Sequence, residues 1–283
     1  MIRFEPIDHV SLPGRLDKPN EDAFAFAANA AVVLDGATGL GDNLMPGESD
    51  AAWLAQFGAR RLMAYVEENQ APRATVRRAM EDAAKSFTAL RRRPTREPYE
   101  VPFASMMMLV NREDGCDALW FGDCAALVKP PGQPVSVIGD TLAKRELESA
   151  RVANLAARHG LAPATGHDRP EFLQALRRAR NLVNSEKGGW LFGPDPAAAD
   201  HGGHRRLDVR KETLVLLATD GFLALVSDYR RYNAEELFAT ACSSGLENLG
   251  RELRGIEAVD ADGKRYPRFK TSDDATAVLL SAA

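Results

Sequence analysis

Short apolar runs and longer stretches with apolar residues every three or four positions divide the first third of the chain. Residues 22–28 and 30–34 are apolar runs separated by a single asparagine, which predicts a tight antiparallel pair of strands. Residues 48–69 and 73–90 repeat apolar residues at helical spacing. Pro72 separates them and is a normal first residue for the second helix.

Strand patterns return in the middle of the chain. Residues 104–111 and 116–121 flank an Asp-Gly dipeptide, which favours a hairpin turn, and residues 125–129 and 134–138 continue the pattern. The next stretch differs, because residues 141–184 have mostly helical spacing and are followed by a segment rich in glycine and proline.

We interpret residues 141–203 as an excursion from the sheet core. Such a segment either determines specificity, as loops and insertions often do, or simply packs at a sheet edge.

The last third predicts a buried strand over residues 213–219, helices over 233–242 and 246–258, and a final strand over 274–281. The overall order is strands, two helices, strands, helices and strands. This order lacks the strict alternation of a parallel doubly wound sheet.

We therefore predict an α+β fold in a single domain over residues 1–283. Two antiparallel β-sheets pack as a sandwich and are flanked by α-helices, in α-β-β-α layers. A helical flap is inserted at about residues 141–203.

The composition is that of an ordinary globular protein. The 283 residues are 45% hydrophobic and 27% charged, with a net charge of -4, which gives no indication of nucleic acid or a membrane surface as partner. There is no apolar run of about 18 residues and no secretory signal pattern at the start. We expect a cytoplasmic protein and leave its oligomeric state open.

The cysteines agree with a reducing compartment. Cys116, Cys124 and Cys242 are odd in number and have no zinc-type spacing. Cys124 follows an aspartate, so a catalytic thiol is an alternative, but no nearby histidine is evident to activate it.

The side chains that suggest chemistry are acids beside predicted strands. Crowded buried carboxylates are unfavourable unless cations neutralise them, and oxygen ligands select hard ions such as Mg²⁺ or Mn²⁺. Two such ions activate water and stabilise a phosphoryl transition state. The acids are Glu21, Asp22, Asp35, Asp123, Asp220, Asp273 and Asp274.

Three of these acids also have a simpler interpretation, and for Asp22 and Asp274 it is a surface position at the start of a strand. Asp35-Gly36 taken alone is first of all a turn signal, as we assume for Asp262-Gly263. His201 and His204 have a spacing that can hold a metal, although an exposed glycine-rich loop fits them better. No phosphate-binding Gly-Lys-Ser/Thr loop or dinucleotide fingerprint is present.

Short motifs from about residue 20 to residue 280 resemble the metal-dependent serine/threonine protein phosphatases of type 2C, in that family's order. NEDAF is similar to the first acidic motif, and LDGATG to the Asp-Gly motif. FGDCAA is similar to the Gly-Asp-Ser-Arg-Ala motif, and LLATDG and SDDATAVLL to the late Asp-Gly and Asp-Asn-Thr motifs. The resemblance indicates a member of the bacterial type.

This resemblance implies two packed antiparallel sheets with outer helices, two Mg²⁺ or Mn²⁺ ions, and water as the nucleophile without a phosphoenzyme. By motif, Asp35 bridges both ions. Glu21 and the carbonyl of Gly36 serve one ion, and Asp220 and Asp273 serve the other. Asp35 and Asp220 are thus the expected catalytic residues.

Two further acids have outer roles by the same resemblance. Asp22 holds metal-bound waters, and Asp123 belongs to a third metal site, whose presence stays open. The predicted excursion falls where the family has its variable flap.

The chain departs from the family pattern at three positions. Asp17 stands where the family has its phosphate-binding arginine, so Lys18 or Arg15 is expected to contact the substrate phosphate instead. Ala37 replaces a general-acid histidine that many bacterial members also lack. Ala224 replaces a late aspartate, which weakens the case for a third ion.

Three functions remain after this comparison. The first is hydrolysis of phosphoserine and phosphothreonine in proteins, with a phosphorylated protein as partner. The second is hydrolysis of a small phosphoester on the same fold. The third is a catalytically silent module that binds phosphoproteins; the missing arginine favours it, and the full set of metal acids opposes it.

Overall fold

The computed structural model describes residues 2–68, 71–113, 115–141, 170–268 and 270–283. The strands of this described part are β1 (Phe4–Leu12), β2 (Asp22–Ala27), β3 (Ala30–Gly36), β4 (Ala104–Arg112), β5 (Gly115–Phe121), β6 (Ala125–Lys129), β7 (Ser136–Ile138), β8 (Gly203–Leu207), β9 (Leu214–Ala218) and β10 (Ala275–Ala282). The α-helices are α1 (Asp50–Val66), α2 (Pro72–Leu90), α4 (Pro170–Arg180), α5 (Asp220–Ser227), α6 (Ala234–Ser244) and α7 (Leu246–Val259). Short 3-10 turns are formed by η1 (Pro98–Glu100) and η2 (Pro196–Asp200).

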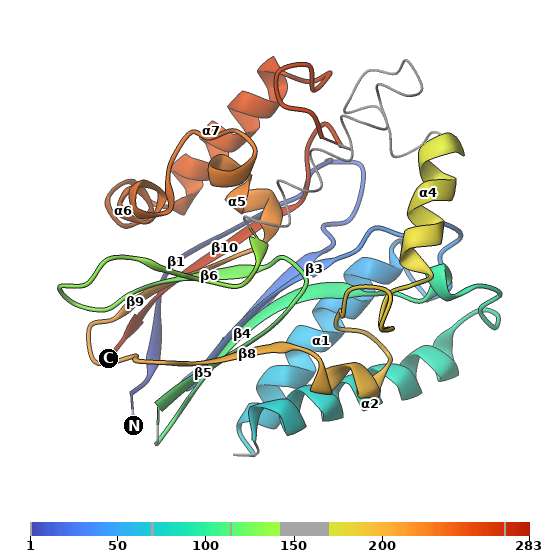
Figure 1. Ribbon diagram of the computed structural model, residues 1–283, viewed down its shortest axis with the longest axis horizontal. Helices are drawn as coiled ribbons and strands as arrows, with labels where there is room; N and C mark the ends of the chain where they lie inside the picture. Colours follow the sequence, from blue (N-terminus) through green and yellow to red (C-terminus); the bar gives the residue numbers. More distant parts are fainter. Residues whose placement is uncertain (1, 69–70, 114, 142–169, 269) are drawn as a thin grey trace.

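Over these residues the strands form two five-stranded antiparallel sheets. One sheet has the order β1-β10-β9-β6-β7, and the other has the order β2-β3-β4-β5-β8. Helices α1 and α2 cover the outer face of the second sheet, while α5, α6 and α7 cover the first (Figure 1). The predicted sandwich with outer helices is therefore confirmed. No helix in the described ranges is both long and apolar enough to cross a membrane.

Strand alternation divides the apolar side chains into three packed layers. On β3, Val32 and Leu34 pack toward α1, whereas Ala31 and Val33 pack toward the other sheet. The two sheets thus share a central layer, and each has a second layer under its own helices. Because the inward-facing row of β3 continues Ala31, Val33, Asp35, the apolar layer gives way to an acid at the end of that strand.

The predicted helices and most predicted strands lie within a few residues of the observed ones. In the tight pair β2–β3, Ala27 lies directly opposite Ala30. The predicted helical stretch 141–184 lies mainly outside the described residues, and α4 is the part of it that the structure describes.

Three elements were not predicted, and each has a weak pattern. β1 is largely exposed at a sheet edge, and its register shifts between Pro6 and Asp8, so its apolar residues do not alternate regularly. β8 has the sequence GHRRL, whose middle is polar. α5 has eight residues and begins at Asp220-Gly221, a dipeptide of the kind that also forms turns.

Candidate active site

The acids gather at one end of the central layer between the sheets. Asp22 on β2 lies directly opposite Asp35 on β3, and Asp35 lies opposite Ser105 on β4. Directly opposed residues on neighbouring strands project to the same face of a sheet. The face that carries apolar residues through the centre therefore ends in a polar row that looks toward the other sheet.

Three aspartates from separate parts of the chain meet there. Asp35 is the next-to-last residue of β3, Asp123 follows β5, and Asp220 is the first residue of α5. One carboxylate oxygen of each lies within 4.8 Å of the others. Ser105 Oγ donates a 2.5 Å hydrogen bond to Asp123, which fixes the orientation of that carboxylate.

The electrostatics of this cluster are unfavourable for a protein without cations. Burial, and then the negative charge of Asp220, raise the pKa of Asp35 well above its usual range. Burial likewise raises the pKa of Asp22, although Thr219 Oγ1 donates a 2.8 Å hydrogen bond to it. The other oxygen of Asp22 is buried and has no partner among the described residues.

These features fit a hard divalent cation. Crowded carboxylate oxygens that repel one another are the ligands that Mg²⁺ and Mn²⁺ prefer, and a bound cation removes the repulsion. The donor set of Asp35, Asp123 and Asp220 contains oxygen only. A divalent metal is therefore the cofactor that suits this site.

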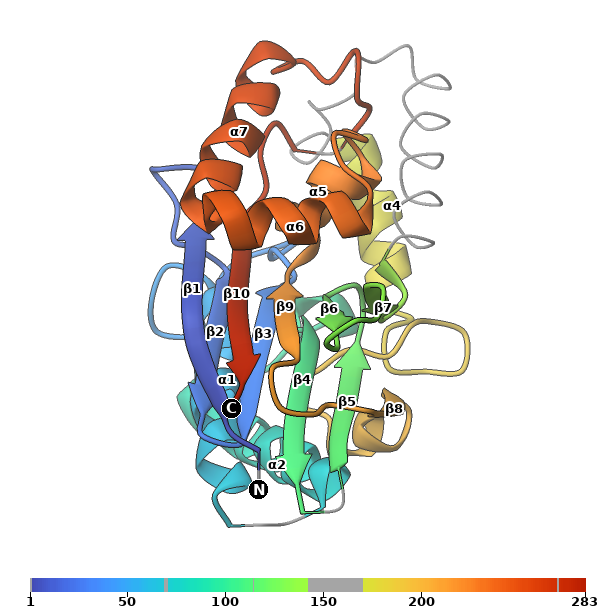
Figure 2. The same cartoon turned by 90° about the vertical axis from the view of Figure 1, so that its left-hand side faces the viewer.

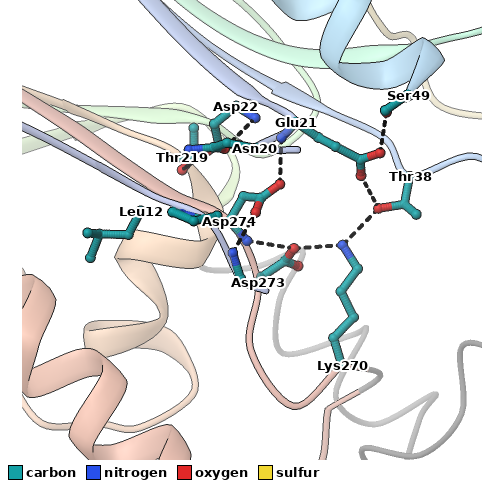
Figure 3. A network of polar contacts seen from close by, with 12 residues as sticks. Leu12, Asn20, Glu21, Asp22, Thr38, Ser49, Thr219, Lys270, Asp273 and Asp274 are labelled. Carbon is teal, nitrogen blue, oxygen red and sulfur yellow. Dashed lines mark hydrogen bonds and ion pairs between the residues drawn. The ribbon is translucent and has the colours of Figure 1, made fainter. Parts of the chain in front are cut away.

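Glu21 lies next to this cluster but is held by hydroxyl groups (Figure 3). Thr38 donates a short hydrogen bond to one carboxylate oxygen of Glu21, and Ser49 donates a 2.5 Å bond to the other. Asp274 supports the same segment, because its carboxylate accepts the backbone N–H groups of Gly14 at 2.6 Å and Glu21 at 2.7 Å. Asp274 thus connects the start of the final strand to the backbone of the first acidic motif.

Asp273 is paired with a lysine that the motif analysis did not identify. Lys270 Nζ donates to Asp273 Oδ1 at 2.6 Å and to Thr38 Oγ1 at 3.0 Å, as Figure 3 shows. Burial acts to lower the pKa of Lys270, but the adjacent Asp273 carboxylate outweighs it and raises the pKa. The ammonium group is therefore charged and lies within the acidic site.

Two clefts meet at this lysine. The first is lined by Asp35, Asp123 and Asp220, together with Arg180 from α4. The second opens on the side of Glu21. Thr38, Lys270 and Asp273 line both clefts and form the wall between them.

The two basic residues expected near the substrate phosphate line the second cleft and are exposed. The guanidinium group of Arg15 donates two hydrogen bonds to the Asp17 carboxylate, at 2.9 and 2.6 Å, so it is already paired. Lys18 has no hydrogen bond or ion pair with another described side chain. The sequence-predicted cations thus lie beside Glu21 and not in the cleft of the three aspartates.

Two glycines in the motifs are required by close packing. A Cβ atom on Gly36 would lie 2.7 Å from the carbonyl oxygens of Glu21 and Ala51, where β3 meets the start of α1. A Cβ atom on Gly221 would lie 1.9 Å from the carbonyl oxygen of Asp274. The Asp-Gly pairs are therefore more than turns, because each glycine lets an acid-bearing segment approach its neighbour.

The alternative site residues have structural roles. Cys124 is fully buried, and burial raises the pKa of its thiol well above the usual range, so it is not a thiolate nucleophile. His204 contacts Asp117 at 2.8 Å, and His201 stacks on Trp190. The two histidines therefore do not form a metal pair with each other.

Pattern reasoning missed Arg180, Lys270, Ser105, Thr38 and Ser49. Ser105 had a usable signal, since it is a polar residue within the otherwise apolar stretch 104–110 of a predicted strand. Neither basic residue belongs to a recognisable motif, and only the fold brings them to the acids.

The family assignment comes from a comparison of the sequence with known families. The sequence model described as "Protein phosphatase 2C" matches residues 15–253, which is most of the chain. The chain belongs to the protein phosphatase 2C family. Among curated proteins, no sequence match is found for this phosphatase.

Solved structures share the fold of this phosphatase at low sequence identity. The serine/threonine phosphatase PstP/Ppp of Mycobacterium tuberculosis is 16% identical, with a TM-score of 0.57 over 99% of this chain and 98% of that chain. A catalytic domain of PstP in complex with two manganese ions is 15% identical, with a TM-score of 0.53 over the full length of both chains. MsPP from Mycobacterium smegmatis, in complex with cacodylate, is 16% identical, with a TM-score of 0.56 over 97% of each chain.

The predicted family, fold and enzyme class are thus confirmed. The protein is a type 2C serine/threonine protein phosphatase that depends on divalent metal, and phosphorylated proteins are its class of substrate.

Proposed function

We propose that this phosphatase hydrolyses phosphoserine and phosphothreonine with two Mn²⁺ or Mg²⁺ ions held by its acids. The main observation behind this proposal is that carboxylate oxygens of Asp35, Asp123 and Asp220 lie within 4.8 Å of one another. When bound, the ions supply the Lewis acidity that makes water nucleophilic at neutral pH and balances charge on the phosphoryl group.

In this proposal, each predicted ligand has a distinct position. Asp35 would hold both ions, and Glu21 and the Gly36 carbonyl would serve one of them. Asp220 and Asp273 would serve the other ion, and both carry charges that act on Asp35. Asp22 and Asp123 complete the set, and whether Asp123 holds a third ion stays a prediction.

The surrounding hydroxyl groups orient these ligands. Thr38 and Ser49 hold Glu21, and Ser105 holds Asp123. Partners of this kind fix ligands in place and are typical of metal sites.

We also propose supporting assignments for the rest of the chain. Lys18 and Arg15 contribute positive charge to the second cleft, where they draw the phosphorylated segment of a substrate toward the acids. Residues 1–283 form one domain, with the segment 141–203 as its variable insertion. The free cysteines fit a cytoplasmic location.

A peptide assay tests the proposal and separates it from the alternatives. With Mn²⁺ or Mg²⁺, the protein should release phosphate from a phosphothreonine peptide, and excess EDTA should stop the release. Preference for a small phosphoester such as a sugar phosphate would favour the second function. Phosphopeptide binding without phosphate release would favour a silent module.

Variants of the acids show which residues are responsible. Asp35→Asn and Asp220→Asn should each lower kcat by roughly a hundredfold or more, because each removes a charged ligand from the site. Asp262→Asn is the matched control, since Asp262 is paired with Lys264 and lines neither cleft. Turnover near the wild-type value in either site variant would contradict the assigned roles.

A further inference from the structure

Two guanidinium groups line the cleft of the three aspartates among the described residues, Arg180 on α4 and Arg268. Arg268 is paired with Asp260 at 2.7 Å, whereas Arg180 has no ion pair with a described carboxylate. Arg180 ends α4, and its Nη1 atom lies 3.4 Å from the carbonyl oxygens of Ala37 and Thr38. These carbonyls follow Asp35 by two and three residues in the chain. Arg180 is thus fixed at the edge of the acidic cluster.

The contacts of Arg180 leave most of its hydrogen-bonding capacity unused. Hydrogen bonds of 3.4 Å are long for an N–H donor, and both acceptors are neutral. Its other guanidinium nitrogens donate to no acceptor within the described ranges, and no carboxylate there pairs with it. Burial lowers its pKa, while the charges of Glu21 and Asp35 raise it.

The neighbouring arginine on the same helix behaves differently. Arg177, one turn earlier, donates two short hydrogen bonds, of 2.8 and 2.6 Å, to the carbonyl oxygen of Leu40 and covers the ring of Tyr99. Arg177 is therefore used in anchoring α4, whereas Arg180 lines the cleft of the acids and has N–H groups without an acceptor among the described residues.

We propose that Arg180 is the residue that binds the phosphoryl group of the substrate in this phosphatase. A phosphate on two metal ions still has oxygens that point away from the ions. A guanidinium group meets two such oxygens at once, because its planar fork matches their spacing. The inference rests on the proposed function, since it assigns a substrate contact to the same site.

The other basic residues are less suited to this role. Lys18 is exposed in the second cleft, and Arg15 is occupied by Asp17. Lys270 lies in the wall between the clefts, but Asp273 and Thr38 already accept its hydrogen bonds. Arg180 alone among these four combines a place in the aspartate cleft with unused donors.

The position of Arg180 also couples phosphate binding to the predicted flap. α4 belongs to the segment that we propose as the variable insertion, so the residue proposed to bind phosphate comes from that insertion. Specificity and phosphate affinity would then depend on the same element.

Binding of inorganic phosphate to the Mn²⁺-loaded protein tests the proposal without turnover. Isothermal titration should give a dissociation constant at least about tenfold weaker for Arg180→Ala than for the wild type, because a charged two-point contact is lost. Arg180→Lys should lie in between, since it keeps the charge without the fork. Arg178→Ala is the matched control, as Arg178 is exposed on the same helix.

Turnover of the phosphothreonine peptide gives the second readout. KM and the inhibition constant of phosphate should rise together in Arg180→Ala. A rise in KM with unchanged phosphate binding would overturn the proposal and leave Arg180 as an anchor of α4. Weakened phosphate binding in Lys18→Ala, with Arg180→Ala unchanged, would move the role to Lys18.

These outcomes separate the inference from the proposed function. If the wild type released no phosphate from the peptide, the proposed function would be wrong. The phosphate titration would still test whether Arg180 binds phosphate. Melting curves of each variant establish that loss of binding reflects the removed side chain and not an unfolded protein.

Discussion

The positively charged ammonium group of Lys270 is paired with Asp273, an acid that the proposed function assigns to metal binding. The ammonium nitrogen lies 2.6 Å from Asp273 Oδ1, so a metal ion on Asp273 has to share or displace this partner. Two positive charges a few ångströms apart also repel one another. If Asp273 is a metal ligand as proposed, Lys270 should therefore weaken metal binding on that side of the site.

Lys270→Met should strengthen the binding of Mn²⁺. We expect a gain of about 1 kcal/mol, or roughly fivefold in the dissociation constant, because the variant removes both the competitor and the repulsion. Isothermal titration of the metal-free protein measures this constant. Lys264→Met is the matched control, since Lys264 pairs with Asp262 on the surface. Unchanged or weaker binding in Lys270→Met would contradict this role.

At the scale of the element, the short helix α5 positions the acid at its first residue. Strand β9 ends at Ala218, and the chain turns at once into α5, so Asp220 stays at the edge of the sheet. Thr219, between them, donates its hydroxyl to Asp22 on the other sheet. This turn depends on the contact between Gly221 and the carbonyl of Asp274.

Gly221→Ala should reduce both stability and turnover. The added methyl group would lie 1.9 Å from a backbone oxygen, so α5 has to move and carry Asp220 away from Asp35. We expect a loss of about 2 kcal/mol or more and a fall in kcat of at least about tenfold. Denaturant unfolding and the phosphopeptide assay measure the two effects.

Gly255→Ala provides the control for Gly221→Ala. Gly255 is exposed on α7, and a Cβ atom there would meet nothing within 4 Å. Alanine should therefore stabilise the protein by about 0.5–1 kcal/mol through helix propensity and leave kcat unchanged. Equal behaviour of the two variants would show that close packing at Gly221 does not matter.

At the scale of the whole molecule, the acids come from both sheets and from the connections between them. Asp35 belongs to the sheet of β3, while Asp220 and Asp273 adjoin β9 and β10 in the other sheet. Figure 2 shows β3 and β9 running toward the same end of the molecule, where α4 and α5 lie. A cation held by these acids would link the two halves of the sandwich.

Metal binding should therefore stabilise the whole fold. With Mn²⁺ at a hundredfold excess over its dissociation constant, the gain is about 2.7 kcal/mol, which corresponds to a rise in melting temperature of roughly 5 °C or more. Calorimetry with and without EDTA measures this rise. Asp35→Asn should remove most of it, and the same rise in that variant would place the metal elsewhere.

The sequence by itself determined the main elements and the acids that they present. Helical spacing indicated α1, α2, α6 and α7, and apolar runs indicated most strands, because burial of one face imposes a period on the chain. The order of these elements predicted two antiparallel sheets with outer helices. The motifs around Glu21, Asp35, Asp123, Asp220 and Asp273 predicted the family.

Weakly patterned elements escaped this reasoning. β1 and β8 lie at sheet edges, where exposure removes the apolar alternation that marks a central strand. α5 is too short for a period and begins with an apparent turn signal.

Only the tertiary structure decided which charges meet. The distances among Asp35, Asp123 and Asp220 follow from strand register and from the packing of two sheets, which no local pattern records. Arg180 and Lys270 reach the site from segments without a motif, while Lys18, close to the expected position in the sequence, faces another cleft. Sequence proximity is a poor guide to the partners of a long basic side chain, because its charged end lies several ångströms from the backbone and its position depends on long-range packing.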